Sequence, residues 1–427
     1  MIPLKFLKEN TREVKESLKK RGDKEKIKLV DEALKKNDEA WEYLREAQKL
    51  RAERNKVSQE INALIKEKQD ASKQIKKAKE IPEKIRELEE KARGLQEKTK
   101  TIIFNLPNVL HESVPFGKDD SDNQEVRKWG KPKKFGFELK THEEIAEKLG
   151  LADFERAAKI SGAGFNFLKG NLVLLDLALQ KFAIDYLMKK KFDLIAPPLM
   201  MRREPYEGVT DLSDFEQVMY KINEDDEYLI ATSEHPLIAM FQNEVINEEE
   251  LPIKLAGVSS CFRREIGGHG VDSKGLNRMH QFNKIEQVVI SKPEDSWKIH
   301  EELIKNAEEL YQKLELPYRI VNVCTGDLGN VAAKKYDLEV WMPRENKYVE
   351  TVSGSNCTFY QAARLNIRYR LGKQGAQDEE KHLVHTLNCT AIATSRVLRA
   401  ILENNQNKDG SVTVPKALQP YFKEKLL

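Results

Sequence analysis

The sequence predicts an α+β protein, in which an antiparallel helical arm precedes a body of antiparallel strands flanked by helices. Three observations carry this prediction. Between residues 24 and 101 the chain holds one glycine and one proline and is rich in helix-forming residues. From residue 192 onward, short apolar runs alternate with polar turns and are bracketed by helical patterns. Neither GxxxxGK[ST] nor GxGxxG occurs, so a nucleotide site would have to lie on an antiparallel sheet.

The composition describes a polar chain with material for two or three domains. Of its 427 residues 33% are charged, the net charge is +3 and the mean hydropathy is −0.63, so any basic surface must be local. No apolar run is long enough to cross a bilayer, and the first residues are charged throughout, unlike a signal peptide. We therefore expect a cytoplasmic protein without a membrane partner. The four cysteines lie far apart and are expected to be reduced and buried.

Residues 1–105 are expected to form the arm. In its second half, apolar positions step alternately by three and four, which is a heptad seam. These positions are Ile85, Leu88, Ala92, Leu95, Thr99 and Ile102. In the first half, larger apolar residues recur at spacings of seven, namely Leu34 with Trp41, and Leu50 with Val57 and Leu64. We expect two helices, separated by a break between Lys66 and Pro82, to form a hairpin roughly 50 Å long.

Six lysines gather where the two helices are expected to turn. They are Lys66, Lys68, Lys73, Lys76, Lys77 and Lys79, and only Glu67 and Asp70 lie among them. A protruding basic end suits a phosphate backbone, because binding there is driven by counterion release. A solvated coiled coil that serves dimerisation or spacing explains the same pattern, and on the arm alone it is the simpler interpretation.

Residues 106–165 are expected to be a linker, because prolines, glycines and a polar run replace the helical pattern. Within it we predict a short helix over 142–149, with Thr141 as its cap and Glu144 completing a capping box. The body, 166–427, begins with an amphipathic helix over 171–191, which could belong to the core or to a dimer interface. The further expected elements are strands over 192–198, 317–323, 336–343 and 348–353, a strand–turn–helix over 228–237, and helices over 293–314 and 391–404.

The stretch 259–290 is predicted to be two strands joined by a glycine-rich loop. Its flanks, GVSSCF and FNKIEQVVI, carry strand patterns, and Gly267, Gly268, Gly270 and Gly275 lie between them. An arginine on one strand can bind phosphate, and a phenylalanine on the other can stack on a purine. The stretch therefore fits a nucleotide site, although an ordinary hairpin with a long loop would carry the same pattern.

Over nearly its whole length, the chain resembles seryl-tRNA synthetases, which are class II aminoacyl-tRNA synthetases. Residues 192–198, 261–286 and 391–396 are similar to the three class II motifs, in the same order. FRRE, MHQF, DFERAAKISG, Leu387-Asn388 and the tripeptide Thr232-Ser233-Glu234 are further marks of the family. The resemblance implies a coiled-coil arm over 1–105, a linker over 106–165 and a class II catalytic domain over 166–427. Cys389-Thr390 and Thr394-Ser395 depart from the bacterial pattern and look closer to archaeal or eukaryotic cytosolic members.

The activity that the resemblance implies is a serine–tRNA ligase. Serine and ATP give seryl-adenylate and pyrophosphate, and serine then passes to the 3′ end of tRNA. The implied partners are tRNA(Ser), tRNA(Sec) where the host has one, L-serine and a second copy in a homodimer. ATP is a substrate and Mg²⁺ a cofactor. The lysines at the arm tip are implied to contact the tRNA, and the loop through Gly267, Gly268, His269 and Gly270 its acceptor end.

The resemblance also assigns roles to residues. For ATP it implies Arg263, Arg264, Glu265, Met279, Phe282, Glu350, Thr351, Val352, Ser353 and Arg396, with Arg263 and Arg396 as the catalytic pair. For serine it implies Thr232, Ser233, Glu234, Arg263, Glu286, Asn388 and Thr390. Glu350 and Ser353 resemble the Mg²⁺-binding pair, and oxygen ligands suit that ion. Thr232, Ser233 and Glu234 could instead cap a helix, or do both.

Simpler explanations exist for four residues. Arg264 could be a surface or fold-supporting charge, Glu350 an ion-pair partner, Asn388 a turn former, and His280 a structural residue rather than a base or ligand. Two other functions fit part of the pattern. A ligase that loads an amino acid onto a carrier protein would lack the long arm. A catalytically inactive relative would not be expected to keep Arg263, Glu265, Phe282, Glu350 and Arg396.

Overall fold

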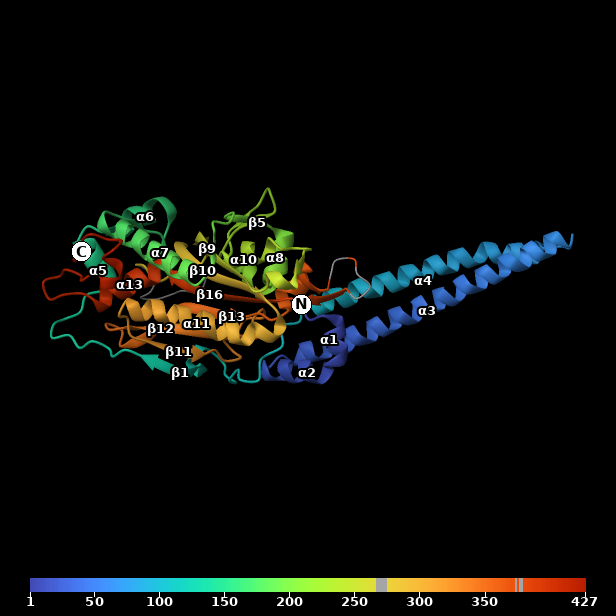
Figure 1. The fold of residues 1–427 in the computed structure, drawn as a ribbon, viewed down its shortest axis with the longest axis horizontal. Coiled ribbons are helices and arrows are strands. Elements are labelled where there is room, and N and C mark those ends of the chain that lie inside the picture. Colours follow the sequence, from blue (N-terminus) through green and yellow to red (C-terminus); the bar gives the residue numbers. More distant parts are fainter. Residues whose placement is uncertain (266–274, 373–374, 376–378) are drawn as a thin grey trace. The chain divides into compact units, whose positions relative to one another are not determined.

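The computed structural model describes residues 1–427 except 266–274, 373–374 and 376–378. The chain forms two compact units, Met1–Val109 and Leu110–Leu427 (Figure 1). Most of the segment expected to be a linker therefore lies within the second unit. In the part of the chain that the structure describes, no helix combines the length and the apolar character needed to cross a bilayer.

The first unit is helical. Its elements are α1 (Leu4–Glu9), α2 (Thr11–Lys20), α3 (Lys24–Lys66) and α4 (Ser72–Phe104). The Asp23 side chain caps α3 by accepting a hydrogen bond from the Lys26 amide at 3.0 Å. The predicted hairpin is confirmed, but its turn is shorter than expected and Pro82 lies inside α4. With 43 residues, α3 is about 65 Å long rather than roughly 50 Å.

The contact between α3 and α4 is made partly by small residues. Toward the tip, Val57, Ile81 and Ile85 form an apolar cluster. Farther from the tip, the buried positions of α3 include Ala33, Ala40 and Ala47, which follow one another at intervals of seven residues. The expected position of Trp41 in the seam is wrong, since its side chain is 52% exposed while the neighbouring Ala40 is buried. Alanine lets two helices approach closely, and an indole at that spacing would hold them apart.

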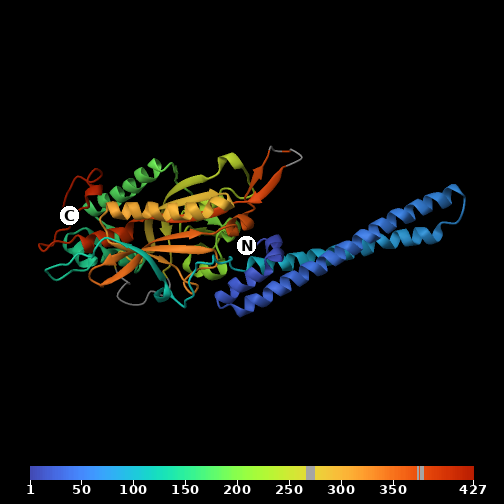
Figure 2. The same ribbon diagram turned by 60° about the horizontal axis from the view of Figure 1, so that its bottom comes forward.

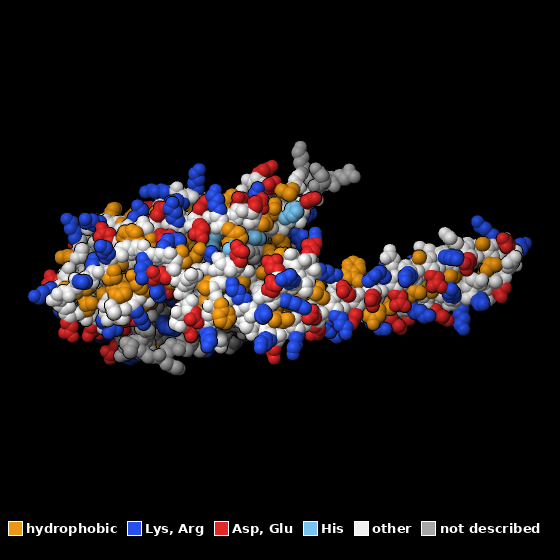
Figure 3. All heavy atoms as spheres, turned by 90° about the horizontal axis from the view of Figure 1, so that it is seen from below, with side chains coloured by type: hydrophobic (Ala, Val, Ile, Leu, Met, Phe, Trp, Pro, Cys, Tyr) orange, Lys and Arg blue, Asp and Glu red, His pale blue; other side chains and the backbone are white. Residues whose placement is uncertain are grey.

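Charge is mixed along the arm, where acidic and basic side chains alternate over the surface (Figure 3). The six lysines expected near the tip are all exposed. Lys77 pairs with Glu53 of α3 at 2.6 Å. Since the other five have no carboxylate within ion-pairing distance among the described residues, the turn keeps a local positive charge.

The second unit is built on an eight-stranded sheet in the order β1-β11-β12-β13-β16-β10-β9-β4 (Figures 1 and 2). All neighbours are antiparallel except β4 and β9. Its strands are β1 (Gln124–Trp129), β4 (Asp193–Ile195), β9 (Ile253–Phe262), β10 (Gln281–Ser291), β11 (Tyr318–Asn322), β12 (Lys334–Met342), β13 (Lys347–Asn356) and β16 (His385–Ala393). The predicted antiparallel sheet flanked by helices is thus confirmed.

Helices cover both faces of this sheet. On one face α7 (Asn171–Lys189), α11 (Ser296–Lys313) and α13 (Thr394–Asn404) share an apolar core with the strands (Figure 2). A second core joins the sheet to α8 (Arg203–Val209), α10 (Glu234–Ala239) and α12 (Tyr360–Leu365). The smaller elements are α5 (His142–Lys148), α6 (Phe154–Ser161), α9 (Leu212–Phe215), β2 (Ala152–Asp153), β3 (Phe167–Leu168), β5 (Met200–Arg202), β6 (Lys221–Ile222), β7 (Glu227–Leu229), β8 (Val245–Asn247), β14 (Arg368–Leu371) and β15 (Glu380–Leu383).

A local sequence signal correctly predicted the start of α5. The capping box of α5 is formed, because Thr141 Oγ1 accepts from the Glu144 amide at 3.0 Å and Glu144 Oε2 from the Thr141 amide at 2.7 Å. Two expectations for the second unit differ from the structure. Residues 391–393, predicted to begin a helix, end β16 instead, and the supposed linker contributes β1 to the sheet edge.

Candidate active site

A cavity of about 400 Å³ lies against the strands β10, β13 and β16. Most of the residues expected to form the site line it: Thr232, Glu234, Arg263, Glu265, Met279, Phe282, Glu286, Glu350, Thr351, Ser353, Asn388, Thr390 and Arg396. Strand alternation explains much of this set. On β10, Ile285 and Val289 enter the helical core, so Lys284 and Glu286 face the opposite side.

Pairing between strands brings the polar residues of the cavity together. On β16, Thr390 lies opposite Glu286 of β10, and Asn388 lies opposite Val288. Asn388 also pairs with Ser355 of β13, which lines the same cavity. Three strands that are distant in sequence therefore supply one polar wall. Asn388 is a strand residue and not a turn former.

A β-bulge turns Glu350 toward the cavity. In the ladder with β12, Thr351 is an extra residue between Glu350 and Val352. Residues three apart on a regular strand face opposite sides of the sheet, but this bulge lets Glu350 and Ser353 line the same cavity.

A second bulge lies at the end of β16. Ala391 is extra there, between Thr390, which pairs with Glu286, and Ile392, which pairs with Ile285. Thr390 and Ala393 consequently both line the cavity, and the strand runs from there directly into α13.

One end of the cavity carries two guanidinium groups. Arg263 follows β9, its Nε donates to the carbonyl of Ala231 at 3.3 Å, and its guanidinium carbon lies 5.4 Å from the ring centre of Phe282. Arg396, in the first turn of α13, donates from Nη1 to the main-chain and side-chain oxygens of Glu350, both at 3.1 Å. An anionic group entering this end would meet both cations next to an aromatic face.

Glu350 is the carboxylate at this end. Burial works against its charge, but Arg396, Lys335 and Arg263 together lower the pKa of Glu350 below its usual value. An ionised carboxylate and the Ser353 hydroxyl are oxygen donors of the kind that Mg²⁺ accepts alongside phosphate oxygens, so the residues present fit that ion. Within the described residues, no group of three or more His, Cys, Asp or Glu side chains could hold a metal by itself.

The other end of the cavity is small, buried and polar. Lys284 Nζ lies 2.5 Å from Glu286 Oε2 and donates to Thr232 Oγ1 at 2.8 Å. The Thr390 hydroxyl donates to Glu286 Oε2 at 3.2 Å. Lys284 and Glu286 are only 5% and 1% exposed, so these charges are balanced mainly by each other.

Glu234 adds a second carboxyl group to this end. Burial and the nearby charge of Glu286 raise the pKa of Glu234 to about 7. Gln361 Nε2 donates to Glu234 Oε1 at 2.9 Å. Two carboxyl groups beside one lysine suit a ligand that brings its own positive charge and hydrogen-bond donors.

Three residues expected at the site do not line the cavity. Arg264 is exposed, and its amide donates to the carbonyl of Val218 at 2.8 Å. Val352 lies in the helical core. Ser233 occupies the N-cap position of α10 but makes no capping bond, and its buried hydroxyl has no hydrogen-bond partner among the described residues. The expected cap is formed by Thr232 Oγ1 instead, which accepts from the Glu234 amide at 3.2 Å.

His280 lies outside the cavity lining. Its ring contacts the Tyr220 hydroxyl and packs against Phe165, and its amide donates to the carbonyl of Gly164 at 2.9 Å. These contacts support the structural interpretation. The loop residues Gly267, Gly268, His269 and Gly270 lie outside the described residues.

Lys284 and Lys335 line the cavity, although neither was proposed from the sequence. Lys284 stands between Phe282 and Glu286 at the spacing of two that defines one face of a strand, so its position could have been predicted. Lys335 pairs with Asp337 at 3.3 Å. It had no such signal, because it lies on β12 and reaches the cavity only through the pairing of β12 with β13.

Comparisons with known proteins agree with this geometry. A model of the seryl-tRNA synthetase N-terminal domain matches residues 1–110, and one of the tRNA synthetase class II core domain (G, H, P, S and T) matches 216–405. The serine–tRNA ligase of Methanoregula boonei is 64% identical over 326 residues, which are 76% of each chain.

Two solved structures are similar over almost the whole chain. Seryl-tRNA synthetase from Pyrococcus horikoshii, complexed with ATP, has 48% identity and a TM-score of 0.96, covering 100% of this chain and 99% of that one. The cytoplasmic serine–tRNA ligase of Naegleria fowleri, in complex with AMP, has 34% identity and a TM-score of 0.90, covering 98% and 96%.

Proposed function

The chain belongs to the seryl-tRNA synthetase family, and from that membership we propose that it is a serine–tRNA ligase whose cavity carries out both halves of the reaction. The observation that supports this most directly is the pairing of two unlike ends in one cavity. The end with Arg263 and Arg396 suits a nucleotide triphosphate, and the end with Thr232, Glu286 and Thr390 suits a small hydroxyl amino acid.

In the first half-reaction, an oxygen of the serine carboxylate attacks the α-phosphorus of ATP. A bond forms between them, the bond to the bridging oxygen breaks, and pyrophosphate leaves. Arg263 stabilises the charge that grows on the α-phosphate, and Arg396 holds the terminal phosphate. Phe282 stacks on the adenine, beside Met279 and Glu265. Arg264, which is exposed, and Val352, which is buried in the core, support the site rather than contact ATP.

Glu350 and Ser353 would hold Mg²⁺ at this end. When bound, the ion neutralises negative charge on the phosphates. The same carboxylate lies 3.1 Å from Arg396 Nη1, so the cation of the protein and the proposed ion share one acceptor.

Serine is selected at the buried end. Glu286 accepts the hydrogen of the serine hydroxyl and Thr232 contacts its amino group, while Asn388 and Thr390 complete the wall. Alanine would fill the same space and keep the contact of its amino group, but it would leave Glu286 without the hydroxyl donor, at a cost of about 1–3 kcal/mol. Ser233 acts indirectly, by packing against β9, where a Cβ at Gly257 would lie 2.4 Å from its hydroxyl.

The arm binds the tRNA through the six exposed lysines near its turn. Their local charge suits a phosphate backbone better than a second protein, because both signs are mixed elsewhere along the arm (Figure 3). The substrate is tRNA(Ser), and tRNA(Sec) where the host has one.

The active form is a homodimer that works in the cytoplasm. On α7, Val173, Leu174 and Leu177 lie on one side of the helix and are 38%, 53% and 54% exposed, which suits a covered interface. The four cysteines are free and buried, as expected in a reducing compartment.

Serine-dependent ATP–pyrophosphate exchange, followed by charging of tRNA(Ser), tests the proposal. Exchange with serine and charging of the tRNA are both expected. The absence of exchange would exclude the enzyme, and exchange without charging would favour a ligase that loads a carrier protein. Analytical ultracentrifugation of the full chain tests the dimer, and a monomer at micromolar concentration would contradict it.

A further inference from the structure

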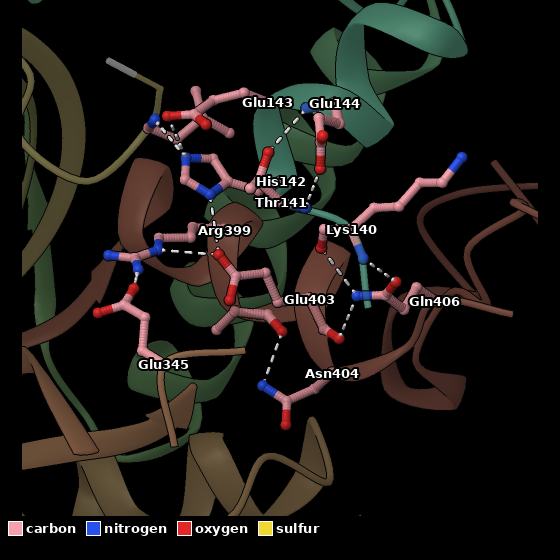
Figure 4. Close-up of polar contacts among 12 residues, drawn as sticks. Lys140, Thr141, His142, Glu143, Glu144, Glu345, Arg399, Glu403, Asn404 and Gln406 are labelled. Carbon is pink, nitrogen blue, oxygen red and sulfur yellow. Dashed lines mark hydrogen bonds and ion pairs between the residues drawn. The ribbon is translucent and has the colours of Figure 1, made fainter. Parts of the chain in front are cut away.

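His142, on α5, bridges two segments that reach the cavity from different parts of the chain (Figure 4). Its Nε2 accepts a hydrogen bond from the Leu276 amide at 3.0 Å. Its Nδ1 lies 2.8 Å from Oε1 of Glu403, on α13. His142 is 5% exposed and does not line the cavity, so it does not touch the reacting groups.

The two contacts assign a different hydrogen-bonding role to each ring nitrogen. A main-chain amide can only donate, so Nε2 must be the acceptor and carry no proton. Nδ1 then carries the hydrogen and donates it to Glu403. Each ring nitrogen therefore has its own hydrogen-bond partner, and together the two partners fix the orientation of the imidazole.

The contact with Leu276 connects His142 to the part of the cavity that is proposed to bind adenine. Leu276 is buried and lies three residues before Met279, which lines the cavity together with Asn277 and Phe282. Gly275 packs directly on the imidazole, since a Cβ there would lie 2.2 Å from His142 Nε2. Its φ of +87° also favours glycine at this position. The chain therefore enters β10 from a point held by His142.

The contact with Glu403 connects His142 to α13, the helix that carries Arg396. Arg396, Arg399 and Glu403 are three and four residues apart, so they lie along one side of α13. Arg399 donates to Glu403 Oε1 at 3.2 Å and forms an ion pair with Glu345 of the β12–β13 turn. Glu345 and His142 thus hold α13 from two directions, one turn and two turns beyond Arg396 (Figure 4).

Stability alone does not explain this network. Arg399 and Glu403 are 2% and 0% exposed, and buried ion pairs contribute little net stability compared with apolar side chains of similar size. Their contacts join α13 to Glu345 of the β12–β13 turn and to His142 of α5. Building on the proposed function, we propose that His142 is a positioning residue for ATP, because it ties the Leu276–Phe282 segment to the helix of Arg396.

Two isosteric substitutions separate the two contacts of the ring. In His142→Asn the amide nitrogen takes the place of Nδ1 and still donates to Glu403, but nothing accepts from Leu276. In His142→Gln the amide oxygen reaches the place of Nε2 and accepts from Leu276, while the contact to Glu403 is lost. Each full-length variant is assayed by ATP–pyrophosphate exchange for the KM of ATP and of serine, and by thermal unfolding.

We expect His142→Asn to raise the KM for ATP about three- to tenfold, the factor that corresponds to one lost hydrogen bond. The KM for serine should stay within about twofold, because Glu286, Asn388 and Thr390 are held by the sheet. His142→Gln should raise the KM for ATP by a smaller factor than His142→Asn, even where its Tm is lower, because it keeps the Leu276 contact and Glu345 still holds α13 through Arg399. Gly275→Ala, which disturbs the same contact from the other side, should also raise the KM for ATP.

Glu308→Gln is the matched control. Glu308 is also buried and also binds an arginine, Arg127, at 2.7 Å, but it lies on α11 and does not line the cavity. This variant should have a lower Tm and an unchanged KM for ATP.

The inference is overturned if the KM for ATP rises across all variants in step with the loss of Tm. It is also overturned if the KM for ATP is unchanged in both His142→Asn and Gly275→Ala. If His142→Asn does not fold, Gly275→Ala and His142→Gln decide the matter by the same comparison. A wild-type chain without serine-dependent exchange would instead contradict the proposed function.

Discussion

Removing the positive charge of Lys284 should be far more damaging than removing that of a surface lysine. In Lys284→Met the side chain keeps its approximate volume, but Glu286 loses the ammonium group 2.5 Å from its Oε2. Both side chains are almost fully buried, so bulk water compensates little for the lost partner. Breaking a buried pair in this way costs about 3–5 kcal/mol, because a charge is left without compensation. Thr232 also loses its donor at 2.8 Å.

The free energy of unfolding, from urea denaturation of the purified variant, measures this cost. Lys128→Met is the control, because Lys128 pairs with Glu125 at 2.8 Å but the two side chains are 50% and 38% exposed. An exposed pair contributes at most about 1 kcal/mol. The KM for serine should rise on the order of tenfold or more in Lys284→Met and stay unchanged in the control. A loss below about 1 kcal/mol in Lys284→Met, with an unchanged KM, would refute the reasoning.

Three further predictions concern the arginine, the arm and pH. Replacing Arg263 with alanine should lower ATP–pyrophosphate exchange about 100-fold or more, and a loss under about threefold would contradict its role. Deleting residues 34–99 should leave exchange nearly intact and strongly impair tRNA charging; an equal fall in both would make the arm structural. The pKa of Glu234 is raised to about 7, so the folded state holds this proton more tightly than the unfolded chain, whose value is near 4.5. Its contribution to stability is full below about pH 4.5 and is lost as pH rises through about 7, and urea denaturation of Glu234→Gln should lack this dependence.

Sequence patterns predicted the elements whose signals are local. The capping box at Thr141 and Glu144 formed as expected, because both partners lie within one turn. The two strands that flank the glycine-rich stretch also formed, since alternation on β10 fixes which side chains enter the core. Most residues assigned by resemblance came together around one cavity.

The failures share a different cause, which is that the deciding contact lies elsewhere in the chain. Residues 391–393 read as helix because alanine favours one, but pairing of Ala393 with Lys284 holds them in β16. Trp41 fits a heptad spacing, yet the partner helix selects Ala40. The position of His142 depends on Leu276 and Glu403, which are 134 and 261 residues away, and no short-range pattern reports such contacts.

The bulge at Thr351 is a place where β13 can lose a residue without losing its register. Loss of that single codon would leave Glu350 opposite Glu339 and Val352 opposite Leu338, so the ladder between β12 and β13 would become regular. Every residue of β13 before the bulge would keep its face, with Glu350 still at the cavity and Val349 still against the helical core. Deletion scanning, unlike substitution scanning, would therefore remove one lining residue while the proposed Mg²⁺ ligands stayed on the same side of the strand.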